Sequence, residues 1–573
     1  MSPSPSLHGF SLVAGDQGAP GGKTFRAVDP AGGAALAPDF HEALPVEADR
    51  ALERAQAAAV TFAHTTGETR ATLLEAIAAG IEELGETLIA RAAAETGLPV
   101  ARLTGERART CGQLRLFAQL VREGSWVDAR LDPALPERKP LPRPDVRRML
   151  RPVGPVVVFG SSNFPLAFST AGGDTASALA AGCPVVVKAH RAHPGTAELV
   201  AGAVARAVAA QGLPPGIFSQ LHGEGATLGI RLVRHPATAA VGFTGSQAAG
   251  RALHDAAAAR PRPIPVFAEM SSLNPVFLLP GALSERGAEI SAGLLASFTL
   301  GVGQFCTKPG LVFAVRGEAT EAFLTALAAG VRAAPCGTML TPGIRAAFLA
   351  NQQRLLAAAG VKLWAGGAGE PAAERHEARP VVARTTAETF LAHPELAEEA
   401  FGPFTLVVEA QDAAGLAACA GALAGQLTAT LHGTAEDLAG AATLRQLLEE
   451  RAGRLVLNGF PTGVEVCPAM HHGGPYPATT DSRFTSPIKL FEYMAAGCAI
   501  VASDLPALRE ILGAEDAVWV RAGDAQSLAE GIRGLAANPD LARAMGERVR
   551  QRARGYTWQA RATRVLEVLQ HLG

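Results

Sequence analysis

Residues 154 to 190 read GPVVVFGSSNFPLAFSTAGGDTASALAAGCPVVVKAH, a pattern of strand, helix and strand. GPVVVFG (154–160) and PVVVKAH (184–190) are continuous apolar runs rich in valine, as expected of strands buried on both faces. TASALAAGC (175–183), between them, has the composition of a helix. A helix that joins two buried strands forms a βαβ unit, so this segment predicts a parallel sheet.

The same alternation continues along the chain. A helix is expected over 196–212, with Gly212 at its end, and further strands are expected at FSQLHG (218–223), TAAVGFTG (238–245) and PIPVFAEM (263–270). A second α/β region covers about 290–460 and includes GLVFAV, FTLVVEA and GRLVLNGF. The sequence therefore predicts doubly wound α/β architecture.

The region before this unit has a different character. Residues 48–125 are predicted to be mostly helical, and the prolines in LDPALPERKPLPRPDVRR (131–148) exclude a long helix and favour extended chain.

Composition excludes several classes of protein. Of the 573 residues, 48% are apolar and 18% are charged, which allows a large core and argues against disorder. A formal net charge of -2 gives no electrostatic basis for binding nucleic acid or an anionic membrane. No apolar run approaches the roughly 18 residues of a membrane span, and MSPSPSLHGF does not have the pattern of an export signal. The seven cysteines are scattered without CxxC spacing, so they indicate neither a disulfide framework nor a zinc site, and a reducing cytoplasm fits them best.

The strongest local motif is LGVGQFCTKPG, residues 300–310. Glycines bracket Cys306 and would let the backbone approach a ligand closely. A catalytic cysteine needs neighbours that favour its thiolate, whereas an isolated cysteine is more often an inert part of the core. The flanking motif favours the nucleophile.

Three further motifs follow predicted strands. Glu269, in PVFAEMSSLNP, closes a strand at the sheet edge where open α/β sheets bind ligands, although a strand-end glutamate often only faces water. Asn163, in FGSSNFPLAFS, can donate a hydrogen bond to an oxyanion or simply form a turn. Gly245 and Ser246, in VGFTGSQAAG, open a helix whose N–H groups can bind phosphate, a weak signal by itself.

Together and in this order, these motifs resemble the aldehyde dehydrogenase superfamily. The blocks GSSNFPLAFSTAGGDTASALAAGCPVVVKAH, VGFTGS, FAEMSSLNPVF, LGVGQFCTKPG and NGFPTGVEVCPAMHHGGPYPATTDSRFTS are most similar to its alpha-ketoglutarate semialdehyde dehydrogenase subgroup, over roughly residues 7–486. The resemblance implies the aldehyde dehydrogenase fold, a Rossmann-like cofactor domain plus an α/β catalytic domain. The implied boundaries are 1–137 with 152–269 for the cofactor domain, 270–457 for the catalytic domain, and 138–151 with 458–486 for bridging segments used in oligomers.

The resemblance also implies roles for the catalytic residues. Cys306 matches the nucleophile that attacks the aldehyde, and Glu269 matches the general base for the water that hydrolyses the thioester. Asn163 matches the amide that stabilises the oxyanion together with the Cys306 backbone N–H.

For the cofactor, Lys188 matches the lysine at the adenosine ribose, and Gly245 and Ser246 match the helix entry near the pyrophosphate. Glu399 matches the glutamate at the nicotinamide ribose, with Phe401 beside it. No metal is implied.

One position departs from many NAD-preferring members. Three residues after the ribose lysine they carry a glutamate, whereas this chain has Arg191. An arginine can pair with a 2′-phosphate, which favours NADP with NAD also accepted. The alternative is that Arg191 points to solvent.

The implied substrate is a semialdehyde with a distal carboxylate, so a cationic partner is expected. TGERART (104–110) offers Arg107 and Arg109, of which Arg109 is the candidate; a helix-surface pair with Glu106 is the alternative.

After FTS (484–486) the chain departs from the superfamily, whose members normally add a short helix and a closing strand. PIKLFEYMAAG (487–497) has a helical pattern with Gly497 as its stop, and CAIVASD (498–504) has the pattern of a buried strand. Residues 487–573 resemble the end of a GT-B glycosyltransferase, in which Glu492 matches the glutamate at the donor ribose. Since the other parts of such an enzyme are missing, transferase activity is not expected, and the chain is interpreted as a fusion of two unrelated sequences.

The sequence therefore predicts an aldehyde dehydrogenase with an appended partial α/β segment. The alternatives are a broad aliphatic aldehyde dehydrogenase, a catalytically impaired fusion, and a nucleotide-sugar-binding module carried on a dehydrogenase scaffold. The expected partner besides the aldehyde is a second copy of the chain, in a homodimer or homotetramer. Loss of the closing strand predicts weaker assembly and lower stability.

Overall fold

The computed structural model describes residues 7–463, 465–467, 469–480, 499–503, 512–521 and 525–553. The chain divides into two compact units, Met1–Ser482 and Arg483–Gly573. The predicted helix over 487–497, the residues Gly497 and Glu492, and the chain after residue 553 lie outside the described residues.

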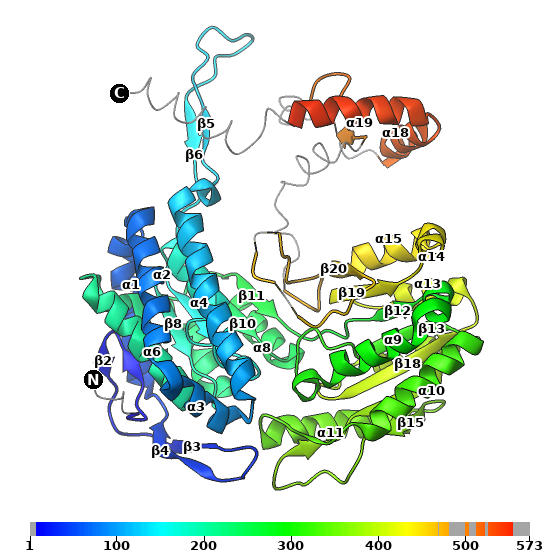
Figure 1. Cartoon of the computed structure of the whole chain (residues 1–573). Helices are drawn as coiled ribbons and strands as arrows, with labels where there is room; N and C mark the ends of the chain where they lie inside the picture. Colours follow the sequence, from blue (N-terminus) through cyan, green and yellow to red (C-terminus); the bar gives the residue numbers. More distant parts are fainter. Residues whose placement is uncertain are drawn as a thin grey trace. The chain divides into compact units, whose positions relative to one another are not determined.

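The first unit begins with a seven-stranded sheet in the order β11-β10-β7-β8-β9-β1-β2 (Figure 1). Strands β7 to β11 are parallel to their neighbours, and β1 and β2 extend the sheet in antiparallel fashion. The strands are β1 (Leu12–Val13), β2 (Asp16–Gln17), β7 (Val156–Phe159), β8 (Val185–Lys188), β9 (Phe218–Leu221), β10 (Ala240–Thr244) and β11 (Val266–Glu269). The predicted parallel sheet is confirmed.

Alternate side chains of this sheet bury on opposite faces, as the strand period requires. Val156 and Val158 pack in a core formed mainly by four helices, whereas Val157 packs on the other face with three helices. The first four helices are α2 (Gly67–Glu83), α4 (Val100–Glu123), α5 (Gly173–Ala181) and α6 (Pro194–Ala210). The other three are α1 (Pro45–Phe62), α7 (Ile230–Arg234) and α8 (Gln247–Ala258). Single turns of α1 and α3 (Gly85–Thr96) are added to the first core. Two helical layers therefore enclose the parallel strands, which explains their continuous valine runs.

The second sheet of this unit also has seven strands, in the order β15-β17-β18-β13-β12-β19-β20. All neighbours are parallel except β15 and β17. The strands are β12 (Val276–Leu278), β13 (Leu311–Val315), β15 (Lys362–Gly366), β17 (Val381–Thr386), β18 (Phe404–Ala410), β19 (Gln426–His432) and β20 (Ala452–Leu457). The three strands predicted in the second α/β region are β13, β18 and β20.

Helices cover both faces of the second sheet as well. One face packs against α9 (Pro280–Thr299) and α10 (Glu318–Ala333). The other packs against α11 (Pro342–Ala357), α12 (Ala387–Ala392), α13 (Ala413–Ala422) and α15 (Ala442–Arg451). Helix α14 (Ala435–Gly440) follows β19, and α3 (Gly85–Thr96) joins α2 to α4.

Short paired strands complete the unit: β3 (Thr24–Val28) with β4 (Ala35–His41), β5 (Arg130–Asp132) with β6 (Val146–Arg148), and β14 (Gly337–Thr338) with β16 (Glu377–Ala378). The proline-rich connector is thus the β5–β6 hairpin, drawn in cyan in Figure 1. The prediction of extended chain there is confirmed.

Residues 471–480, here called the crossing segment, contact both sheets. The backbone N–H of Gly425 donates to the carbonyl of Tyr476, beside the start of β19 (3.2 Å). The N–H of Met270 donates to the carbonyl of Ala478 (2.8 Å), and that of Thr480 donates to Ala268 (3.0 Å). The end of the crossing segment therefore extends the first sheet beyond β11, and its earlier part lies against the second sheet.

The second unit contains the parallel pair β21 (Val501–Ser503) and β22 (Val518–Val520), followed by α18 (Ala525–Ala536) and α19 (Pro539–Ala553). Ile500, Ala502, Leu512 and Val549 form its small core. The predicted strand in CAIVASD is confirmed within the described residues.

Candidate functional site

One cavity of about 1470 Å³ in the first unit is lined by residues of both sheets and their loops. It brings together nine of the ten predicted site residues: Asn163, Lys188, Arg191, Gly245, Ser246, Glu269, Cys306, Glu399 and Phe401. Arg109 is the predicted site residue that does not line it.

Cys306 lies on a loop that follows the 3₁₀ turn η4 (Leu300–Gly303). Asn274, fully buried, holds this loop, because its Nδ2 donates to the carbonyls of Cys306 (2.8 Å) and Lys308 (3.0 Å). A Cβ at Gly303 would lie 2.3 Å from the backbone of Gly402. This glycine was expected to allow close approach of a ligand, but the close neighbour in the structure is the chain itself.

Asn163 follows β7 and reaches the same loop from the first sheet. Its Nδ2 donates to the carbonyl of Gln304 (2.9 Å), two residues before Cys306. Its own carbonyl accepts from Arg102 Nη2 (2.7 Å). The side-chain amide of Asn163 is thus held beside the loop that carries Cys306.

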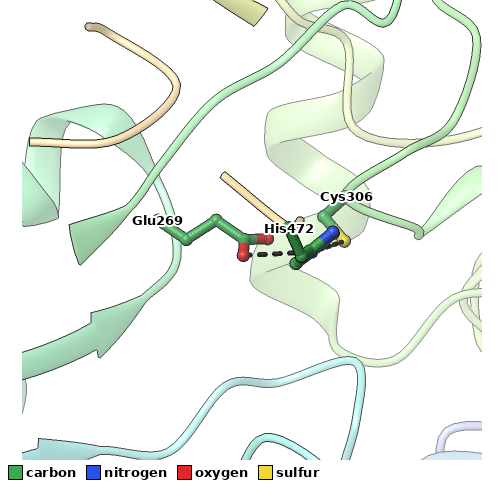
Figure 2. A group of neighbouring side chains, drawn as sticks. All are labelled: Glu269, Cys306 and His472. Carbon is green, nitrogen blue, oxygen red and sulfur yellow. Dashed lines mark hydrogen bonds and ion pairs between the residues drawn. The ribbon is translucent and has the colours of Figure 1, made fainter. Parts of the chain in front are cut away.

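Glu269 ends β11, directly beside Thr244 of β10. Its Oε2 lies 3.1 Å from Nε2 of His472, and the same Nε2 lies 3.5 Å from Sγ of Cys306 (Figure 2). His472 belongs to the crossing segment and was not singled out from the sequence. It stands in the quoted block NGFPTGVEVCPAMHHGGPYPATTDSRFTS, but nothing in its spacing indicates that it reaches residues 166 positions away.

Burial and charge set the protonation of these three groups. Burial raises the pKa of Glu269, but His472 more than offsets this, so the net pKa lies below its usual value. Burial lowers the pKa of His472, yet Glu269 and Cys306 raise it well above the ordinary value. Burial and then Glu269 raise the pKa of the Cys306 thiol. These shifts favour an ionised carboxylate, a protonated imidazole and a neutral thiol.

The ligand atoms of Glu269, Cys306 and His472 all lie within 4.8 Å of one another, close enough to surround one metal ion. The ion pair and the hydrogen bond account for the same spacing without a metal.

Lys188 ends β8, and only 7% of it is exposed. Burial lowers its pKa to about 8, Arg191 adds to that effect, and Glu42 and Glu224 oppose it. Helix α8 begins at the same cavity, which Gln247 and Ala248 line. The side chain of Ser246 caps the helix by accepting a hydrogen bond from the N–H of Ala249. A cation and the N–H groups of a 12-residue helix facing one cavity suit the phosphates of a dinucleotide.

Arg191 does not simply point to solvent. Its Nη1 lies 3.1 Å from Glu224 Oε1 and 3.3 Å from Glu42 Oε1, and its guanidinium lies 4.4 Å from the centre of the Phe25 ring. Its side chain is still 38% exposed, and two carboxylates already neutralise its charge.

Glu399 also lines the cavity, and it accepts a hydrogen bond from Ser271 Oγ. Burial raises its pKa, and Lys308 opposes that effect. Lys308 is itself buried and donates to the carbonyls of Ala400 (3.1 Å) and Phe404 (3.0 Å). Lys308 thus connects the loop that carries Cys306 to the segment that carries Glu399 and Phe401 by hydrogen bonds.

Arg109 packs against two aromatic rings that do not line the cavity either. Its guanidinium lies 5.1 Å from the centre of the Phe168 ring and 5.7 Å from that of Phe164. Glu106, its alternative partner on the helix surface, is instead buried and accepts from the N–H groups of Leu166 (2.9 Å) and Ala167 (3.0 Å). The surface pair is therefore wrong.

Comparison with known proteins identifies this arrangement. The profile described as "Aldehyde dehydrogenase family" matches residues 18–495. The chain belongs to the aldehyde dehydrogenase family. It is 53% identical over 481 residues to "Alpha-ketoglutaric semialdehyde dehydrogenase 2" of Azospirillum brasilense, covering 84% of this chain and 90% of that protein. It is 49% identical over 448 residues to "Alpha-ketoglutaric semialdehyde dehydrogenase" of Acinetobacter baylyi, covering 78% and 84%.

Solved structures show the same fold. A betaine aldehyde dehydrogenase from Staphylococcus aureus in complex with NAD+ superimposes with a TM-score of 0.72 at 20% identity, covering 82% of this chain and 91% of the other. The predicted aldehyde dehydrogenase fold is confirmed.

The aldehyde dehydrogenase match does not account for the whole chain. A profile described as "Glycosyl transferase-like" matches residues 462–567, overlapping the end of the first match. The predicted similarity of the C-terminal segment is confirmed. Among the described residues, no helix is long and apolar enough to cross a membrane.

Proposed function

We propose that this protein oxidises an aldehyde to a carboxylate with NAD(P), and that its substrate is alpha-ketoglutarate semialdehyde. The convergence of Cys306 and Glu269 in one cavity with Lys188 and Glu399 carries the proposal. The substrate assignment is supported by two relatives named as alpha-ketoglutaric semialdehyde dehydrogenases, at 53% and 49% identity.

In the proposed reaction, the Cys306 thiolate attacks the aldehyde carbon and forms a thiohemiacetal. Asn163 Nδ2, once released from Gln304, and the Cys306 backbone N–H stabilise the oxyanion. NAD(P), when bound, supplies the hydride acceptor that turns this adduct into a thioester. Glu269 then takes the proton of the water that hydrolyses the thioester.

The residues proposed to hold the cofactor are Lys188 at the adenosine ribose, Gly245 and Ser246 at the pyrophosphate, and Glu399 with Phe401 at the nicotinamide ribose. We propose a preference for NADP through Arg191. Because Glu42 and Glu224 already contact that arginine, a 2′-phosphate must displace the more exposed partner, Glu224, whose side chain is 46% exposed.

Arg109 is the proposed partner of the distal carboxylate of the substrate. Its guanidinium Nε is buried and has no hydrogen-bond partner among the described residues. Its positive charge also lowers the pKa of Glu269, so it acts electrostatically on the site.

We further propose that the protein is cytoplasmic and that a second copy covers the β5–β6 hairpin, as expected for bridging segment 138–151. Large apolar side chains there are exposed: Leu135 (44%), Leu141 (70%), Val146 (51%), Met149 (59%) and Leu150 (53%). The domain boundaries stated from the sequence are part of the same proposal.

The direct test measures reduced nicotinamide formed by full-length protein from alpha-ketoglutarate semialdehyde, with NADP and with NAD. Cys306→Ala is the matched control and is expected to lose roughly a thousandfold or more in turnover. No turnover by folded protein, or equal turnover by Cys306→Ala, would contradict the proposal.

A further inference from the structure

The feature that the proposed reaction does not use is His472. Its Nε2 is shared between the two reacting side chains, 3.1 Å from Glu269 Oε2 and 3.5 Å from Cys306 Sγ (Figure 2). Only 16% of the His472 side chain and 12% of the Glu269 side chain are exposed, so solvent screens this group weakly.

Other charged groups face the same place from neighbouring elements. Arg109 on α4 lies behind Phe168, whose ring centre is 6.2 Å from that of His472. Burial lowers the pKa of Arg454 on β20, and the charge of Cys306 partly opposes that effect. In the part of the chain that the structure describes, neither guanidinium is hydrogen-bonded to the carboxylate or the sulfur, whereas the imidazole contacts both.

This geometry bears on how the thiol is deprotonated. Sγ and the carboxylate of Glu269 lie within 4.8 Å of each other. If the thiol proton moves to the carboxylate, the S–H bond breaks, an O–H bond forms and the electron pair stays on sulfur. The negative charge thereby moves from oxygen to sulfur. An imidazolium within 3.5 Å of both atoms faces that charge before and after the transfer.

We propose that His472 is a positioning residue that keeps a positive charge beside Cys306 and Glu269 while the thiol proton passes between them. The inference rests on the proposed role of Cys306 as the nucleophile. It assigns to the crossing segment a part in activating the thiol, in addition to joining the sheets.

The decisive measurement is the pH dependence of Cys306 alkylation by iodoacetamide in full-length protein, without aldehyde or nicotinamide. Peptide mass spectrometry separates Cys306 from the other cysteines. In His472→Gln the profile is expected to shift upward by at least about one pH unit, a tenfold slower reaction at a given acidic pH. The neighbouring exposed His471, changed to Gln, is the matched control and should leave the profile in place.

A second variant separates charge from folding. His472→Arg keeps a cation, so it is expected to alkylate at lower pH than His472→Gln. Coincident profiles of wild type and His472→Gln, or of the Arg and Gln variants, would overturn the inference. If the profile of His472→Gln is unshifted and the wild type oxidises the aldehyde, only the role of His472 is removed. If the profile of His472→Gln is shifted but the wild type does not oxidise the aldehyde, the proposed function is removed.

Discussion

At the scale of single residues, the ion pair between His472 and Glu269 makes stability depend on pH. The folded pKa of His472 is raised well above 6.5, so its contribution is fully present below about pH 6.5 and is lost as pH rises through the folded value. The folded pKa of Glu269 is lowered from 4.5, so its contribution is lost as pH falls through that lower value.

We therefore expect His472→Gln to destabilise the protein most between about pH 5 and pH 6.5, by roughly 2–4 kcal/mol. The difference in thermal midpoint from wild type should shrink as pH rises toward 9. A constant difference across that range would show that the residue only fills space.

Glu224 offers a second test at this scale. Glu224→Gln removes one carboxylate from Arg191 and should raise kcat/KM for NADP about fivefold, with little change for NAD, because one unit charge a few ångströms from a phosphate is worth about 1 kcal/mol. Steady-state kinetics with each nucleotide measure this. Glu318→Gln, an exposed carboxylate on α10, is the control; an unchanged ratio would argue that Arg191 does not meet a 2′-phosphate.

The sequence placed most of the site at this scale. Glu269 and Lys188 end strands of the first sheet and Asn163 follows another, and parallel strands bring such ends to one edge. Cys306 follows a 3₁₀ turn instead, and only its glycine-rich motif indicated it. His472 follows no strand, and its position depends on how the crossing segment is folded over both sheets. No local pattern encodes that path.

At the scale of elements, the junction of α3 with α6 is held by one buried carboxylate. Glu95 accepts from Gly195 N and Thr196 N (both 2.8 Å) and from Thr196 Oγ1 (2.7 Å), and it is fully buried. This carboxylate satisfies the free N–H groups at the start of α6.

Glu95→Ala should therefore lower the free energy of unfolding by roughly 3 kcal/mol or more, since it leaves these donors buried and unpaired. Chemical denaturation measures the change. Glu83→Ala, an exposed glutamate at the end of α2, should cost under about 0.5 kcal/mol. Equal effects of the two changes would be inconsistent with the capping role.

Elements were predictable where burial dictates composition. The valine runs of β7 and β8 are buried on both faces, so they stand out in the sequence. The strands of the β5–β6 hairpin are exposed throughout, and neither an apolar run nor an alternation marks them. Only the prolines indicated extended chain there.

At the scale of the whole molecule, the chain matches the aldehyde dehydrogenase family over residues 18–495 and a glycosyl transferase-like family over residues 462–567. Every proposed catalytic residue lies before Ser482, where the first unit ends. We propose that the superfamily's closing strand is replaced, and self-association through the exposed hairpin is then expected to be weaker than in a dehydrogenase that retains the strand.

Sedimentation velocity over a range of concentrations should then show reversible dissociation at micromolar protein. Val146→Asp, on the hairpin, should move the balance further toward monomer, whereas the exposed Val60→Asp on α1 should not. A dimer or tetramer that persists at nanomolar concentration would contradict this expectation.

The crossing segment has a mechanical consequence. It is hydrogen-bonded to β11 on one side and to Gly425 beside β19 on the other, and His472 lies within it. His472 lies four residues before Tyr476, the first of these hydrogen-bonded residues, so a displacement of one sheet against the other would pull on the backbone that follows the imidazole. The distance between the two sheets is thus linked to the reactivity of the thiol through the crossing segment. A change at the proposed cofactor-binding residues that moves one sheet would therefore also change the surroundings of Cys306.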